Sequence, residues 1–134
     1  MTSAADAFAA HVRAWNDRDL DAWLAIFADD VELEDPVGGV PKHGRSALLT
    51  TWERSQTEDR RWELRPRRVV DCGAEAAVDL VNHGTLGDRT EVVESIEIWR
   101  VDDAGLVVSV RTFFATDPDI HDPYYLPADH HQER

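Results

Sequence analysis

The second half of the sequence alternates between apolar and polar residues, and very short breaks interrupt this alternation. The breaks consist mainly of Asp and Gly, which favour turns. Alternation with period two is typical of strands that bury one face, and connections this short can join only antiparallel neighbours. The sequence therefore predicts an antiparallel meander. Its expected strands are residues 62–70, 76–83, 90–101 and 106–114.

The first half carries residues at helical spacing. Ser3 followed by Asp6 is typical of a helix start, because a hydroxyl can cap the first turn and an acid favours it. Residues 16–19 break this helix, and a second amphipathic helix of about two turns is expected to follow. The predicted face of the first helix holds Phe8, His11, Val12 and Trp15, and that of the second holds Leu20, Trp23, Leu24 and Phe27.

A strand and a third helix connect the two halves. Residues 31–35 alternate like a half-buried strand, residues 36–41 form a turn, and Gly44 opens the third helix. Helices followed by a meander predict an α+β fold, with three helices packed on one face of a curved, mostly antiparallel sheet. We expect one domain over residues 1–116 and a polar, partly ordered tail over 117–134.

The formal net charge of −13 limits the partners of this chain. Such a charge repels phosphate backbones and anionic lipids, so we expect neither nucleic acid nor membrane as a partner. A single cysteine, Cys72, and no visible signal segment predict a cytoplasmic location.

Asp35 is the first candidate for chemistry. It has the same parity as Val31 and Leu33, so its strand would direct it to the apolar side. Burial raises the pKa of a carboxyl, which is how a base is tuned to take a proton from carbon near neutral pH. The alternative is that Asp35 only opens a turn before Pro36 and bonds nearby amides.

Two further candidates are Glu97 and His11. Both faces of the predicted strand around Glu97 are partly apolar, so this side chain is either solvated outside or directed inward. If it is inward, it could stay protonated and donate a hydrogen bond. His11 shares a helix face with Phe8 and Trp15, so it is either a satisfied core residue or a neutral donor to a substrate oxygen.

Other residues could line a pocket. Asn82 shares parity with Val78 and Leu80, which fits a pocket-lining donor and a residue at a strand end equally well. The histidines of the tail lack metal-ligand spacing, so no metal site is expected. Several aromatic residues are predicted in the core or the pocket wall: Trp15, Phe27, Trp52, Trp99 and Phe114.

Two blocks of sequence resemble the ketosteroid isomerase family. The first is an Ala-Asp-Asp helix end, a short strand ending in Glu-Asp-Pro-x-Gly, and a Gly-Arg helix start, over residues 27–45. The second is the acid-bearing strand and hairpin of residues 97–105. The resemblance covers about residues 5–116. It extends to the larger group similar to nuclear transport factor 2 and the polyketide cyclase SnoaL.

The resemblance implies a conical α+β barrel around a deep apolar pocket, commonly as a homodimer. It implies that Asp35 is the general base, that His11 stands in place of a Tyr donor, and that Glu97 stands in place of a protonated Asp donor. It places Trp52 and Phe27 where the family has pocket tyrosines, and Phe114 where it has a pocket Trp. The resemblance thus implies that this chain has the general base of the family but different hydrogen-bond donors for the substrate oxygen.

The leading hypothesis is a cofactor-independent acid–base isomerase acting on a small, apolar, cyclic substrate, in which Asp35 moves a proton next to a carbonyl. Rival hypotheses are a cyclase or dehydratase of the SnoaL type, an epoxide hydrolase, or a binding module without chemistry. Arg100-x-Asp102 has the look of an epoxide-opening set, but it stands beside a turn and is expected in solvent.

Overall fold

The computed structural model describes residues 2–114, so the predicted tail of residues 117–134 lies outside the described residues. The described part is an α+β fold, as predicted, with three helices on a six-stranded sheet that does not close. None of its helices is long and apolar enough to cross a membrane. The elements are α1 (Ala4–Asn16), α2 (Leu20–Leu24), β1 (Phe27–Glu34), β2 (Lys42–His43), α3 (Gly44–Ser55), β3 (Arg60–Asp71), β4 (Glu75–Leu86), β5 (Arg89–Val101) and β6 (Val107–Phe113).

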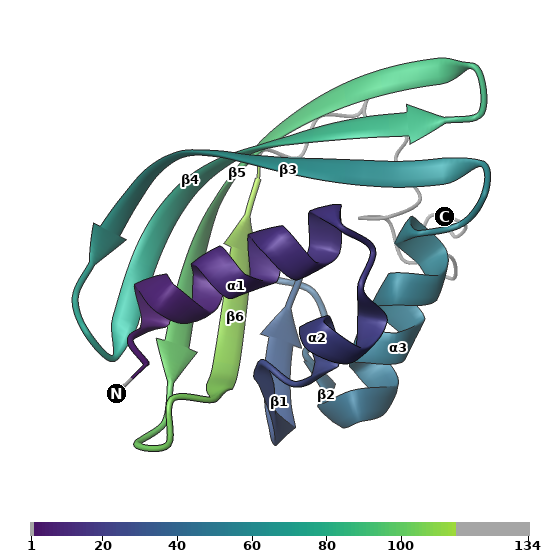
Figure 1. Cartoon of the computed structure of the whole chain (residues 1–134). Coiled ribbons are helices and arrows are strands. Elements are labelled where there is room, and N and C mark those ends of the chain that lie inside the picture. Colours follow the sequence, from purple (N-terminus) through teal and green to yellow (C-terminus); the bar gives the residue numbers. More distant parts are fainter. Residues whose placement is uncertain (1, 115–134) are drawn as a thin grey trace.

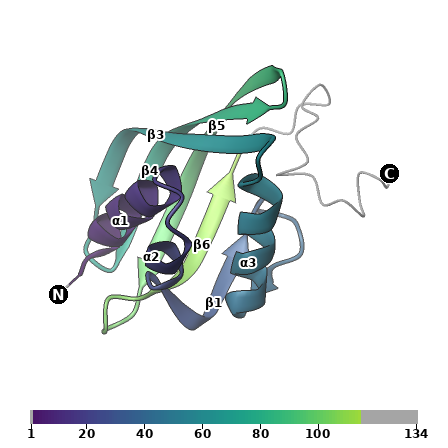
Figure 2. The same cartoon turned by 45° about the vertical axis from the view of Figure 1, so that its right-hand side comes forward.

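The sheet has the strand order β2-β1-β6-β5-β4-β3. Strands β3 to β6 form the predicted antiparallel meander, and β1 joins it by pairing parallel to β6. This parallel pair places the end of β1 beside the middle of β6 (Glu34 opposite Arg111). Figures 1 and 2 show α1 crossing the concave face of the bent sheet, with α2 and α3 beside β1.

The helix starts follow from local sequence. Ser3 and Asp6 form a capping box, in which the amide of Asp6 donates to Ser3 Oγ at 3.1 Å and the amide of Ser3 donates to Asp6 Oδ2 at 3.3 Å. Asp19 caps α2 by accepting from the amide of Ala22 at 3.2 Å.

The predicted length of the second helix is wrong. Helix α2 ends at Leu24, and Phe27 begins β1 instead of completing a helical face. Pairing with β6 is the physical reason, because Phe27 lies opposite Val107, whose amide donates to the carbonyl of Ile26 at 3.0 Å. Strand pairing satisfies backbone groups that a two-turn helix would leave free at its end.

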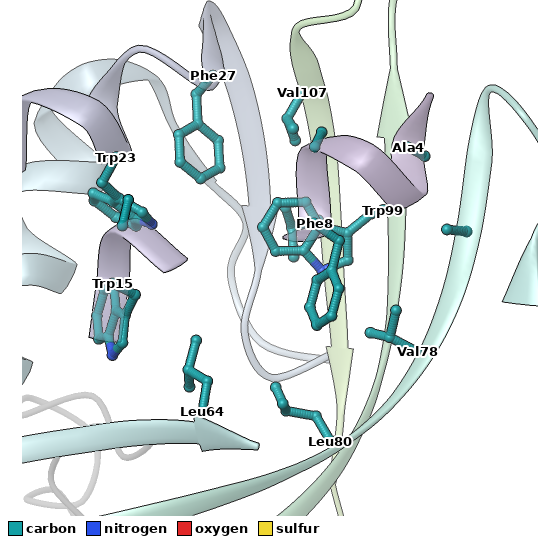
Figure 3. Packing of buried hydrophobic residues seen from close by; sticks show 14 of the residues in the cluster. Ala4, Phe8, Trp15, Trp23, Phe27, Leu64, Val78, Leu80, Trp99 and Val107 are labelled. Carbon is teal, nitrogen blue, oxygen red and sulfur yellow. The ribbon is translucent and has the colours of Figure 1, made fainter. Parts of the chain in front are cut away.

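The core lies between α1 and the concave face of the sheet. From Val93 to Val101 of β5 the residues with the parity of Glu97 are buried, whereas Val92 and Ile96 of the opposite parity are 60% and 45% exposed. Figure 3 shows aromatic side chains from four elements facing one another, and these rings form much of the core. They include Phe8 and Trp15 from α1, Trp23 from α2, Phe27 from β1 and Trp99 from β5.

Candidate functional site

A cavity of about 60 Å³ lies among the aromatic and aliphatic side chains of the core. Its walls come from all three helices and all six strands of the described residues, so residues far apart in the sequence meet there. Asp35, Glu97 and His11 all line it. The structure thus brings together the three side chains that the sequence singled out, among mostly aromatic and aliphatic neighbours.

Asp35 follows the last residue of β1 and is directed into the cavity. The residue is partly exposed, but its Oδ1 is fully buried and accepts no hydrogen bond within the described residues. The neighbouring amides bond elsewhere: Val37 donates to the carbonyl of Thr112 and Gly39 donates to that of Pro36. Oδ1 is therefore not engaged in capping its own turn.

Burial raises the pKa of Asp35 from 3.8 to about 7, and the positive charge of Lys42 opposes this rise. Lys42 reaches the cavity from the two-residue strand β2, which pairs with β1 so that Lys42 lies opposite Leu33. The carboxyl group of Asp35 therefore changes its charge near neutral pH.

Glu97 occupies the middle of β5, between Val78 of β4 and Thr112 of β6. It is only 8% exposed, so the structure excludes the outward, solvated orientation. Its Oε1 accepts a hydrogen bond from Trp99 Nε1 at 2.8 Å. Burial raises the pKa of Glu97 to about 7; the Trp99 bond opposes this rise and the charge of Asp35 adds to it.

His11 lies on α1 and is buried among aromatic rings. Its ring centroid is 4.6 Å from that of Trp99, and its Nδ1 accepts a hydrogen bond from Trp23 Nε1 at 2.8 Å. Burial lowers the pKa of His11 to about 3, so the imidazole is neutral across the physiological range. His11 is at once a satisfied core residue and part of the cavity wall.

Asn82 lies within β4 and lines the cavity, so it is not a residue at a strand end. Its amide nitrogen already donates to the carbonyl of Val93 at 2.9 Å and to Ser95 Oγ at 3.1 Å. These two bonds use both N–H groups, which leaves Asn82 as an organiser of the sheet and not as a donor to a ligand.

Three of the predicted aromatic residues, Trp15, Phe27 and Trp99, line the cavity. Trp52 and Phe114 do not line it, but both are partly buried and pack against the core, which is the other position predicted for them. The ring of Trp52 packs behind the wall, 5.2 Å from the rings of both Trp15 and Trp23.

Phe114 lines a separate surface hollow together with Arg67 and Ile96. Strand β6 ends at Phe113, so the alternation that turns Val110 and Thr112 inward does not extend to residue 114.

Sequence reasoning missed several lining residues. The position of Trp23 on a predicted apolar helix face could have indicated that it lines the cavity. No sequence pattern could have indicated Lys42, because a strand of two residues is too short to show a period. The missed residues are Trp23, Leu33, Lys42, Leu48, Thr51, Leu64, Val110 and Thr112.

The remaining candidates lie outside the cavity. Arg100 is exposed, and Asp102 Oδ1 accepts from the turn amides of Ala104 and Leu106 at 3.0 Å each. Within residues 2–114, no three His, Cys, Asp or Glu side chains gather closely enough to hold a metal ion.

The fold and the site define a class: an open α+β cone of the nuclear transport factor 2 type, with buried carboxyl groups in an apolar cavity. The SnoaL-like domain pattern matches residues 8–110, and the chain belongs to this family.

Similar proteins support this membership. A steroid Δ-isomerase of Nocardioides simplex is 33% identical over 94 residues, which cover 70% of this chain and 75% of the relative. The protein RV0760c of Mycobacterium tuberculosis has 27% identity and a TM-score of 0.78, over 87% of this chain and 95% of that one. The Δ5-3-ketosteroid isomerase of a Mycobacterium species has 25% identity and a TM-score of 0.76, over 86% of this chain and 95% of that one. The resemblance inferred from the sequence is thereby confirmed.

Proposed function

We propose that this protein is a cofactor-independent isomerase that shifts a carbon–carbon double bond next to the carbonyl of an apolar, cyclic substrate. The observation that carries the proposal is the unpartnered, buried Oδ1 of Asp35 in the same cavity as the buried carboxyl of Glu97 and the neutral imidazole of His11. A buried carboxylate without a partner is a stronger base than one in water. The proposal is consistent with the steroid Δ-isomerase relative.

The charges in the cavity favour Asp35 as the base and Glu97 as the acid. Lys42 lowers the pKa of Asp35, so Asp35 gives up its proton more readily. The resulting carboxylate raises the pKa of Glu97 and helps to hold its proton. One proton shared unequally by two buried carboxyl groups yields a base and a neutral donor at the same pH.

The proposed reaction has two proton transfers. Asp35 takes a proton from the carbon beside the carbonyl, and the electron pair of that C–H bond moves into a dienolate. Glu97 and His11 donate hydrogen bonds to the oxygen as its negative charge develops. Asp35 then returns the proton to the far carbon of the dienolate, and the double bond ends in conjugation with the carbonyl. A donor aimed at developing charge contributes about 3 kcal/mol to such a barrier.

The size of the cavity bears on the substrate. Its 60 Å³ is smaller than the roughly 150 Å³ of an engineered cavity that binds benzene. A cyclic substrate therefore requires lining side chains to turn aside, or it would enter the cavity with one ring only. RV0760c has been solved in complex with estradiol-17β-hemisuccinate, which supports a steroid-like substrate as the first to test.

The test is turnover of a Δ5-3-ketosteroid, followed by the absorbance of the conjugated product. We expect Asp35→Asn to abolish turnover and to retain ligand binding, measured by quenching of tryptophan fluorescence. Glu32→Gln is the control, because Glu32 is an exposed carboxylate on β1 outside the cavity. Wild-type turnover by Asp35→Asn would refute the mechanism, and binding without turnover by the wild type would favour a binding module.

We also propose that the protein is a homodimer that associates through the outer face of its sheet. Val92 and Ile96 of β5 and Phe113 of β6 are 60%, 45% and 38% exposed, and Ile96 lies opposite Phe113 in the strand register. Exposed apolar side chains clustered on one face are typical of an interface. Ile96→Glu should convert a dimer into a monomer in light-scattering measurements; a wild-type monomer would refute the proposal.

A further inference from the structure

Two indole N–H groups are bonded to the two proposed donors of the cavity. Trp23 Nε1 donates to His11 Nδ1 and Trp99 Nε1 donates to Glu97 Oε1, each at 2.8 Å. Both indoles are buried, with Trp23 3% and Trp99 2% exposed. An indole nitrogen can donate a hydrogen bond but cannot accept one. Each of these contacts therefore determines which atom of its partner is free of a proton.

At His11 the consequence is one tautomer. Nδ1 must present a lone pair to the indole of Trp23, so the single proton of the neutral ring lies on Nε2. Moving the proton to Nδ1 would set two N–H groups against each other in a buried place. The imidazole thus keeps one donor, Nε2–H, for a ligand in the cavity that His11 lines.

At Glu97 the consequence is one protonated oxygen. Oε1 accepts from Trp99, and a neutral carboxyl group accepts best through its carbonyl oxygen. The proton of neutral Glu97 therefore lies on Oε2. The bond also favours the charged form of Glu97, so Trp99 limits how far burial raises the pKa of this group.

We propose that Trp23 and Trp99 are positioning residues: Trp23 fixes the tautomer of His11, and Trp99 fixes the protonated oxygen of Glu97. The site then presents two preset donors, Nε2–H and Oε2–H, and is selective for a ligand that offers an oxygen as acceptor. The use of these donors in catalysis rests on the proposed function, but the proton positions do not. Packing of the core alone would explain aromatic rings at positions 23 and 99. It would not explain why their N–H groups bond His11 and Glu97.

The main test is the tautomer of His11, read from the two ring ¹⁵N shifts in a long-range ¹H–¹⁵N spectrum and assigned with His11→Gln. We expect wild-type Nε2 to be protonated and Nδ1 to be unprotonated throughout pH 5 to 9. Trp23→Phe should give averaged shifts of two exchanging tautomers. Trp15→Phe is the matched control, because it also removes a buried indole donor next to His11, but one that bonds the carbonyl of Trp62 at 2.8 Å. It should leave the His11 tautomer unchanged.

A proton on Nδ1 in the wild type, or an unchanged His11 tautomer in Trp23→Phe, would overturn the proposal for Trp23. The wild-type spectrum shows which ring nitrogen of His11 carries the proton even if Trp23→Phe does not fold. For Trp99, the ¹³C titration of the Glu97 carboxyl should move to higher pH in Trp99→Phe, and no movement would overturn that half. Neither readout uses a substrate, so both remain decisive if turnover of a ketosteroid fails.

Discussion

Replacing Asp35 by Asn should stabilise this protein at alkaline pH and not at acidic pH. The buried carboxyl has its pKa raised from 3.8 to about 7, so the folded state holds this proton more tightly than the unfolded state. Between these two pH values the folded state binds more protons, and its stability falls as pH rises. The contribution of Asp35 is full below about pH 4 and is lost as pH passes 7. Asn carries no charge at any pH, so it removes this dependence.

The size of this stability change follows from the pKa shift of Asp35. About three pKa units at roughly 1.4 kcal/mol each give about 4 kcal/mol, which is an upper value because residue 35 is partly exposed. We expect the variant to gain about 2 to 3 kcal/mol over the wild type between pH 4.5 and 8.5, because part of the effect already falls below pH 4.5. This change with pH is more informative than the difference at one pH, since burying the Asn amide has its own constant cost.

The assay is urea unfolding followed by tryptophan fluorescence at pH 4.5, 6, 7 and 8.5. Asp30→Asn is the control: it removes the same charge from an exposed position on β1, and its difference from wild type should vary little with pH. If the stability difference between Asp35→Asn and wild type is the same at pH 4.5 and 8.5, the carboxyl is not desolvated and the reasoning is refuted.

Other predictions concern the pH dependence of turnover. Lys42→Met should shift the acidic limb of kcat/KM to higher pH, because it removes the charge that lowers the pKa of Asp35, whereas Lys42→Arg should not. Glu97→Gln should remove the alkaline limb, because an amide cannot lose the proton that Glu97 loses above about pH 7; persistence of that limb would exclude Glu97 as its source. His11→Gln should lower kcat by about a hundredfold without removing a limb near pH 6.5, since the imidazole is already neutral there.

Local sequence was sufficient to predict much of this fold. The alternation of β4 and β5 and the capping box of α1 are short-range features, and the structure reproduces them. The strand parity of Asp35 also indicated the correct side. These features depend on neighbours within a few residues, so a pattern can show them.

The features that the sequence could not predict depend on contacts between distant parts of the chain. Glu97 could not be oriented because both faces of β5 carry apolar residues, and only the packing of α1 shows which face is inside. Phe27 was placed on a helix because pairing of β1 with β6 is not visible locally. The same parallel pairing sets Asp35 in one cavity with Glu97, and no period in the sequence encodes it.

The central claim is that Asp35 and Glu97 titrate as a desolvated, interacting pair inside one cavity. A ¹³C NMR titration of their side-chain carboxyl carbons, assigned with Asp35→Asn and Glu97→Gln, measures this directly. The structure predicts that both groups titrate near pH 7 and that Asp35→Asn moves the Glu97 titration to lower pH. An Asp35 midpoint near 4, or a Glu97 titration unaffected by Asp35→Asn, would contradict it.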